Sequence, residues 1–231
     1  MRYPRSSPLC GPEMEAHPLQ QALRFLTRTG IVDYNGHASQ RTAEGFVVNS
    51  ADSNRARLTG DDLSHVALDG TPLDGPRPPN EVHLHTAIYA ARPDVQAIVH
   101  GHPPAITLLS SARQPLRPVM PQGALVWDLP VYPHAHSIST RERGMALAAC
   151  IGAARGAILQ GHGLVTLGAD LIEACALALY AEENAARQVQ AAALGGAVPL
   201  TEDEVAEYRK ALNSHALFAK AWAFHLTPKE N

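Results

Sequence analysis

The sequence predicts one layered domain in which helices cover both faces of a sheet, in an α/β or α+β arrangement. Segments with helical spacing of apolar residues occur in mixed order with short apolar runs that end at glycine or proline. The chain has 231 residues, 45% of them hydrophobic, which suffices for one sizeable core but is short for two domains. We find no internal repeat, so a single domain over residues 19–231 is expected, preceded by a loose leader over 1–18.

The first elements are a helix and several short strands. The helix is expected over 19–29, because Leu19, Leu23 and Leu26 share one face and Gly30 can end it. Strands are expected at 45–48, 56–59 and 66–68, the last meeting a hairpin-type turn at Asp69-Gly70.

A proline-rich loop separates these strands from the next helix. Residues 71–80 can form neither a helix nor a central strand, because proline lacks the backbone N–H. Asn80 is a candidate N-cap for an amphipathic helix that starts at Glu81 and ends before Pro93. Glu81 is therefore expected at a helix N-terminus beside a rigid loop.

The later part of the chain is mostly helical. Helices are expected over 105–112, over 140–153 with Thr140 as cap, over 171–193, and from the capping box at 201–204 towards Leu217. Residues 114–131 show little periodicity, and short strands are expected on both sides of His162.

Three histidines lie where strands are expected to end. His100 and His102 close the apolar run Ala97-Ile98-Val99, and side chains two apart on a strand point to the same face. His162 lies between two glycines in a similar position. Three imidazoles with an open position are typical of catalytic metal sites. The alternative is that, among 12 histidines, this spacing arises by chance in surface or core histidines.

Composition argues against several classes of function. The formal net charge of −3 without a long basic run disfavours binding to nucleic acid or to a membrane surface. No apolar run has membrane-spanning length. Cys10, Cys150 and Cys175 are widely spaced and odd in number, so buried free thiols in a reducing compartment, the cytoplasm, are expected.

Several motifs together resemble the class II aldolase and adducin-head family. They are Gly36-His37-Ala38-Ser39, Leu58-Thr59-Gly60, Asn80-Glu81, Ala90-Ala91-Arg92-Pro93-Asp94, Ile98-Val99-His100-Gly101-His102, Gly161-His162-Gly163 and a long helix over 170–187. The similarity runs from about Leu19 to Gly195.

This resemblance implies a fold, a metal and an assembly. The fold would be a three-layer α/β/α sandwich around a mixed sheet, often a homotetramer with active sites between subunits. His100, His102 and His162 would hold one divalent ion per subunit, either Zn, Mn, Fe or Co. Glu81 would be a fourth ligand or the catalytic acid or base, and it could move a proton if an apolar wall raised its pKa.

Departures from the family pattern bear on the small-molecule substrate. The family's sugar-phosphate aldolases and epimerases typically carry a Ser-Ser pair and a Gly-Asn step, where this chain has Pro79-Asn80 and Gly36-His37. Proline offers no donor to a phosphate. The motifs 102–104, 129–133 and 140–144 look more like those of the family's aryl decarboxylases, of the dihydroxyphthalate type. A decarboxylase of a hydroxylated aromatic or heteroaromatic acid is therefore favoured.

Other residues are weaker candidates for substrate binding. His37 or His83 could act as the acid, and Asn80, Arg55, Arg57 or Thr59-Gly60 could meet a second carboxylate. Each has a simpler interpretation: His83 and His85 could face solvent or a neighbouring subunit, and the arginines could be solvated. His134 and His136 are expected in an exposed loop, and Phe218, Trp222 and Phe224 could cap a site or pack in the core.

Three alternative functions stay open. Retro-aldol cleavage or epimerisation of a small hydroxy-acid or sugar is the runner-up. An iron-dependent oxygenase acting on an aromatic acid would use the same three histidines. An inactive adducin-like interaction module is the third alternative, and that branch normally lacks these histidines.

Overall fold

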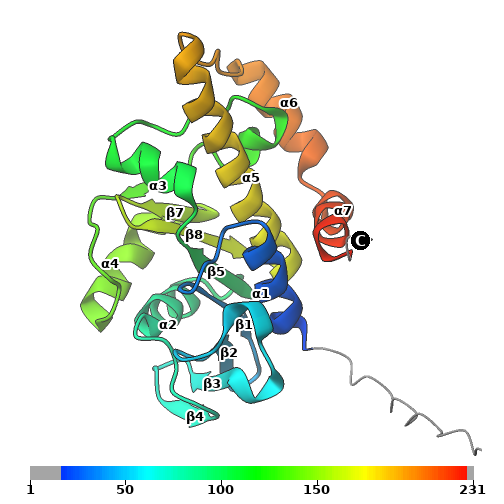
Figure 1. Cartoon of the computed structure of the whole chain (residues 1–231). Coiled ribbons are helices and arrows are strands. Elements are labelled where there is room, and N and C mark those ends of the chain that lie inside the picture. The colour runs from blue at the N-terminus through cyan, green and yellow to red at the C-terminus, as the bar shows by residue number, and fades with distance from the viewer. Residues whose placement is uncertain (1–16, 228–231) are drawn as a thin grey trace, which may run out of the picture.

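The computed structural model describes residues 17–227, which form eight strands in one sheet covered by helices on both faces (Figure 1). The strands are β1 (His37–Arg41), β2 (Gly45–Asn49), β3 (Leu63–Ala67), β4 (Pro72–Asp74), β5 (Ala97–Gly101), β6 (Val131–Tyr132), β7 (Gly156–Leu159) and β8 (Gly163–Gly168). The helices are α1 (Pro18–Arg28), α2 (Val82–Ala91), α3 (Pro104–Ser111), α4 (Arg141–Ile151), α5 (Leu171–Ala191), α6 (Glu202–Leu212) and α7 (His215–Leu226).

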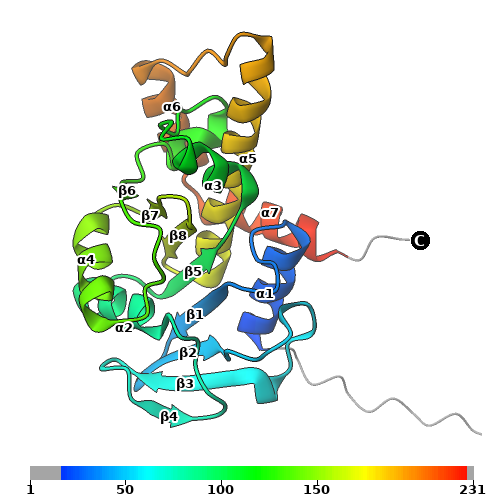
Figure 2. The ribbon, with the colours of Figure 1, turned by 60° about the vertical axis from the view of Figure 1, so that its left-hand side comes forward.

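The sheet is mixed, with the strand order β4-β3-β2-β1-β5-β8-β7-β6. All neighbouring pairs are antiparallel except β6 and β7, which are parallel. Helices α2 and α4 cover one face, and α1, α5 and α7 cover the other (Figure 2). The predicted three-layer α/β sandwich with a mixed sheet is therefore confirmed.

Strand β5 shows how the sheet separates two cores. Ala97 and Val99 pack into the cluster that contains α1 and α5, while Ile98 packs into the cluster that contains α2 and α4. This alternation follows from the two-residue period of a strand, and all five residues of β5 are buried. The histidine pair at its end therefore extends from a rigid central strand.

Two predicted elements differ from the structure, and one strand was not predicted. Residues 55–57 form a 3-10 turn rather than part of a strand, because the Asn54 side chain accepts a hydrogen bond from the Ala56 N–H. Strand β1 was not expected, since its sequence His-Ala-Ser-Gln-Arg has no apolar alternation. The last predicted helix is two helices, which are separated at Asn213 and Ser214.

Asn80 is not the N-cap of α2. Its side chain accepts a hydrogen bond from Arg77 at 2.8 Å, while Glu81 occupies the N-cap position without making a side-chain cap. The prediction of a helix beginning near Glu81 is correct, but the capping role was assigned to the wrong residue.

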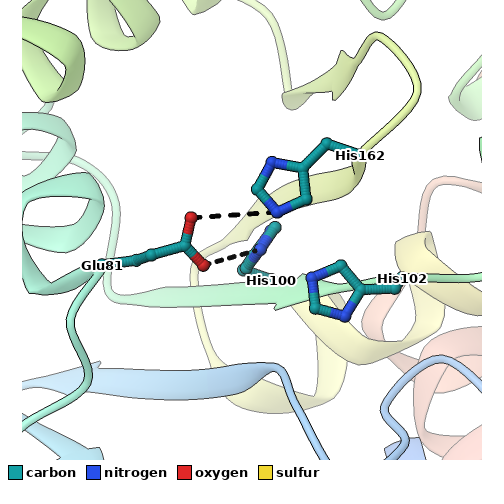
Figure 3. Close-up of side chains that lie close together, drawn as sticks. All are labelled: Glu81, His100, His102 and His162. Atoms are coloured by element: carbon teal, nitrogen blue, oxygen red, sulfur yellow. Dashed lines mark ion pairs between the residues drawn. The ribbon is translucent and has the colours of Figure 1, made fainter. Parts of the chain in front are cut away.

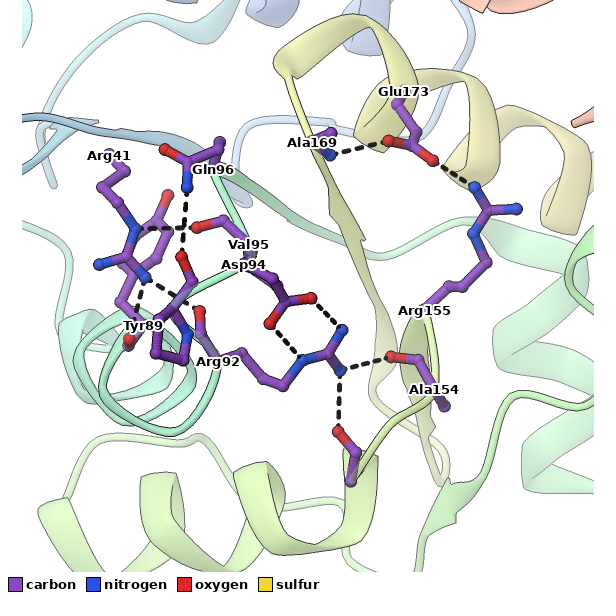
Figure 4. A network of polar contacts seen from close by, with 12 residues as sticks. Arg41, Tyr89, Arg92, Asp94, Val95, Gln96, Ala154, Arg155, Ala169 and Glu173 are labelled. Atoms are coloured by element: carbon purple, nitrogen blue, oxygen red, sulfur yellow. Dashed lines mark hydrogen bonds and ion pairs between the residues drawn. The ribbon is translucent and has the colours of Figure 1, made fainter. Parts of the chain in front are cut away.

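Two arginines hold the C-terminal end of α2 against the sheet (Figure 4). Arg41 of β1 donates to the carbonyls of Tyr89, Arg92 and Val95 at 2.8 to 3.0 Å. Arg92 pairs with Asp94 and donates to carbonyls at the end of α4. Because the last carbonyls of a helix lack partners within it, Arg41 fixes the end of α2 relative to β1, and Arg92 ties it to the segment after α4.

Some expectations concern thiols and membranes. Cys175 is buried and Cys150 half-buried, and both are free thiols. Cys10 and all but the last two residues of the predicted leader lie outside the described residues. Within residues 17–227, no helix combines the length and the apolar character needed to span a membrane.

Candidate metal and catalytic site

Four side chains from distant parts of the sequence converge at one end of the central strands (Figure 3). Glu81, His100, His102 and His162 each offer one ligand atom, and these atoms lie within 4.8 Å of one another. His100 lies in β5, His102 follows it, and His162 lies in the turn before β8. The antiparallel pairing of β5 with β8 brings the end of one strand beside the start of the other.

Glycines permit the close approach of the two segments that carry the histidines, and of the Ile31 loop beside them. A Cβ atom at Gly101 would lie 2.2 Å from the Ile31 carbonyl oxygen, and one at Gly163 would lie 2.3 Å from the Gly101 oxygen. Any larger residue at these positions would push the segments apart, so both glycines contribute to placing the imidazoles.

The contacts of His100 fit a bound cation. This fully buried ring directs Nδ1 to the Leu164 carbonyl oxygen at 3.0 Å. Nδ1 therefore carries the hydrogen of the neutral tautomer, and Nε2 carries the lone pair. Among the described residues Nε2 has no hydrogen-bond partner, and it lies 3.3 Å from Oε2 of Glu81. Two acceptors that face each other are stabilised by a positive ion between them.

The other two imidazoles are also suited to a metal. Burial, together with the neighbouring His100 and His162, lowers the pKa of His102 to about 4. Burial and His100 also lower the pKa of His162. Both rings are thus neutral at pH 7, the form that binds a metal ion. Nδ1 of His102 lies 3.9 Å from Oδ1 of Asp33, so a carboxylate lies near this ring, as is common for histidines that bind a metal.

Glu81 is held as a carboxylate by two donors to Oε1, and the His37 ring lies near Oε2. Oε1 accepts from the Ser137 hydroxyl at 3.0 Å and from the Ile138 N–H at 2.8 Å, and Oε2 lies 3.5 Å from Nε2 of His37. Burial by itself raises the pKa of Glu81, but the neighbouring imidazoles of His100 and His37 lower it well below its usual value. The expected apolar wall is absent, and Glu81 is poised as a ligand or a base.

A cavity of about 340 Å³ opens beside the four residues. Its lining consists of Asn35, Gly36, His37, Ala51, Arg55, Arg77, Pro79, Asn80, Glu81, His102, Ser137 and His162. Of the weaker sequence candidates, His37, Arg55 and Asn80 therefore lie at this cavity.

Other candidates lie elsewhere. Thr59 and Gly60 are exposed and outside the cavity lining, where Thr59 bonds to Asp62. His83 faces a separate groove between α2 and α4. His85, for which exposure was considered, is fully buried.

The remaining histidine and aromatic candidates lie outside the four-residue cluster. His134 is exposed and stacks on His136 at 5.0 Å, apart from the four-residue cluster. Phe218 is buried in the core, Trp222 stacks on Phe25, and Phe224 is exposed. The packing interpretation of Phe218 and Trp222 is thus correct.

The sequence interpretation missed Ser137, Arg77 and Asn35. Ser137 has no local signal, because its position depends on the irregular loop after β6. Arg77 could have been found, since it lies between prolines in the loop that leads to Glu81.

Fold and site together define a class II aldolase-type protein with a three-histidine, one-carboxylate cluster. The chain belongs to the Class II Aldolase and Adducin N-terminal domain family, whose model matches residues 18–189.

Relatives with different activities have similar levels of sequence identity to this chain. A 3,4-dihydroxyphthalate decarboxylase of Terrabacter sp. is 32% identical over 201 residues, 79% of this chain and 83% of the relative. An L-fuculose phosphate aldolase of Escherichia coli O6:H1 is 29% identical over 182 residues, 78% of this chain and 84% of the relative. The solved L-fuculose 1-phosphate aldolase from Glaciozyma antarctica PI12 superposes with a TM-score of 0.79 at 26% identity, covering 90% of this chain and 85% of that one.

Proposed function

We propose that this protein is a divalent-metal-dependent decarboxylase of a hydroxylated aromatic or heteroaromatic carboxylate. The observation that carries the proposal is the set of donors at the cavity. Ser137 is the one hydroxyl side chain of the lining, and it is engaged by Glu81. The other side-chain donors include the guanidinium groups of Arg55 and Arg77 and the amides of Asn35 and Asn80. Guanidinium groups match the planar geometry of carboxylates.

Arg55 is built to hold such an anion. It is 8% exposed, and its Nε and Nη1 donate to the carbonyls of Gly36, Ala51 and Ser53. Nη2 has no hydrogen-bond partner within residues 17–227, so it is the part of this fixed plane that can meet a substrate carboxylate. Arg77 offers a second, exposed charge on the same cavity.

His100, His102 and His162 would hold the ion, which supplies positive charge to stabilise the negative charge left when carbon dioxide leaves. Glu81 moves the proton in this proposal. Its Oε2 first accepts the proton of the substrate hydroxyl, and the resulting carboxylic acid then returns that proton to the ring carbon that lost carbon dioxide. One proton thus moves from the hydroxyl oxygen to the ring carbon, Glu81 becomes a carboxylate again, and the product leaves as a phenolate that takes up a proton from water.

Retro-aldol cleavage is the second candidate, and the ionised state of Glu81 favours it. A retro-aldol reaction begins when a base removes a hydroxyl proton, and Glu81 is held as a base by the Ser137 hydroxyl and the Ile138 N–H. The similarity to both decarboxylases and fuculose aldolases is compatible with either reaction.

The test is to incubate metal-analysed protein with 3,4-dihydroxyphthalate and, separately, with L-fuculose 1-phosphate. We expect carbon dioxide from the aromatic acid and no aldehyde from the sugar phosphate. Release of an aldehyde and dihydroxyacetone phosphate would establish the aldolase instead. Oxygen uptake that requires iron would establish an oxygenase, and protein that binds no metal and turns over neither substrate would support an inactive module.

A matched pair of variants tests the ligand assignment. His102→Ala should lose bound metal and activity while it stays folded by circular dichroism. His134→Ala is the control, because His134 also belongs to a His-X-His pair but is exposed outside the cluster. Wild-type metal content in His102→Ala would overturn the assignment.

We also propose that the protein acts in the cytoplasm as a homotetramer, in line with the family resemblance of its sequence. Light scattering of the purified protein tests the assembly, and a monomeric mass contradicts it.

A further inference from the structure

A chain of four buried side chains extends from Glu81 into the protein. Nε2 of His37 lies 3.5 Å from Glu81, and its Nδ1 lies 2.7 Å from Nε2 of His85. Nδ1 of His85 lies 2.7 Å from the Ser39 hydroxyl, which lies 2.9 Å from the Tyr89 hydroxyl. All four residues are at most 3% exposed.

The chain forms where one face of strand β1 meets one face of helix α2. His37 and Ser39 lie two apart on β1, so they share one face of the strand. His85 and Tyr89 lie four apart on α2, so they share one face of the helix. Because α2 packs against this side of the sheet, the two pairs interleave into one line of hydrogen bonds.

The number of hydrogens on these four side chains determines which group donates and which accepts along the chain. At 2.7 Å, only one of the facing nitrogens of His37 and His85 can carry a hydrogen. In one arrangement Tyr89 donates to Ser39, Ser39 to His85 and His85 to His37, which leaves the Nε2–H of His37 directed towards the Glu81 carboxylate. Each hydrogen between Tyr89 and His37 then has an acceptor, whereas the Nε2–H of His37 faces Oε2 of Glu81 at 3.5 Å, longer than an ordinary hydrogen bond.

The opposite arrangement leaves two groups without partners. The Tyr89 hydroxyl would have to donate elsewhere, but within residues 17–227 it makes no hydrogen bond except to Ser39. Nε2 of His37 would face the carboxylate as a second acceptor. A buried group without its hydrogen bond costs about 1–3 kcal/mol, so the first arrangement prevails. Burial also lowers the pKa of His37 to about 4 and that of His85 well below its usual value, which agrees with neutral rings.

We propose that His85, supported by Ser39 and Tyr89, is a positioning residue that fixes His37 in the tautomer whose Nε2–H points at Glu81. This N–H presents its positive end to Oε2 of Glu81 at 3.5 Å, beside the histidine cluster. The geometry of the chain does not depend on the substrate, and only its consequence for turnover rests on the function proposed above.

Nitrogen-15 NMR of histidine-labelled full-length protein at neutral pH tests the proposal without any substrate. The ring signals of residues 37 and 85 are assigned by their loss in His37→Gln and His85→Gln. We expect both rings to be neutral with the hydrogen on Nε2. A hydrogen on Nδ1 of either ring, or a doubly protonated ring, overturns the proposal whatever the enzyme assay shows.

The serine variant tests whether the far end of the chain sets the tautomer. Ser39→Ala removes the donor to Nδ1 of His85, so His37 should lose its pure Nε2–H signature. Ser64→Ala is the control, because Ser64 is also buried in this sheet but bonds to the Pro76 carbonyl. Unchanged histidine signals in folded Ser39→Ala would show that His37 is fixed by other contacts. If Ser39→Ala does not fold, the wild-type spectrum still decides the proposal.

Discussion

Replacement of Gly101 by alanine tests whether backbone crowding places the histidines. The new Cβ would lie 2.2 Å from the Ile31 carbonyl oxygen. Carbon and oxygen atoms in contact need about 3.3 Å, so the loop at Ile31 or the end of β5 must move by about 1 Å. The same carbonyl accepts a 3.0 Å hydrogen bond from the His102 N–H, so the movement also disturbs a ligand residue.

Two quantities should change in Gly101→Ala. We expect the free energy of unfolding to fall by about 1–3 kcal/mol, the usual effect of overpacking. Zinc affinity should fall by about 10- to 100-fold, the effect of disturbing the residues that support metal ligands, since ligand distances tolerate only about 0.2 Å. Urea unfolding and competition with a zinc chelator measure the two effects.

A matched glycine serves as control for this experiment. A Cβ at Gly60 meets no atom within 4 Å, so Gly60→Ala should leave both zinc affinity and unfolding close to wild type. Wild-type zinc affinity in Gly101→Ala would refute the reasoning, because the imidazoles would then keep their places without the close approach of the backbone.

Three further predictions concern stability. The pKa of His37 is about 4 in the fold against 6.5 for the free side chain, so the unfolded chain binds the proton first. About 3 kcal/mol of unfolding free energy should therefore be lost as the pH falls from 6.5 to 4, and urea titrations should show a shallower loss in His37→Gln. Asn184→Ala should lower the unfolding free energy by about 2–4 kcal/mol, because the buried amide bonds to the Val119 N–H and the Arg117 carbonyl; a loss below 0.5 kcal/mol in urea would contradict this. Zinc at about 100 times its dissociation constant should stabilise the wild type by about 2.7 kcal/mol in thermal unfolding, and His102→Ala should not respond.

The histidine cluster was predictable because each of its members has a local signal. His100 and His102 follow a buried apolar run, and His162 is flanked by glycines at a second strand boundary. That the two boundaries meet depends on the antiparallel pairing of β5 with β8, which no local pattern encodes. The family resemblance supplied that step.

The surroundings of Glu81 were not predictable from local pattern. Its partners His37 and Ser137 come from β1, which lacks strand-like alternation, and from a loop without regular structure. The direction of its pKa shift depends on these neighbours, so an expectation based on apolar surroundings had the wrong sign. His85 looked like a solvent-facing residue because a helix pattern alone does not reveal a polar partner on the facing strand.

The carboxylate and the imidazoles are carried by separate parts of the fold. Glu81 stands between the proline-rich loop and α2, whereas the histidines extend from β5 and from the turn before β8. Substitutions in residues 75–80 can therefore change what the site accepts while the central strands keep the ligand geometry. Such a division would let changes in the loop alter substrate chemistry without moving the three imidazoles.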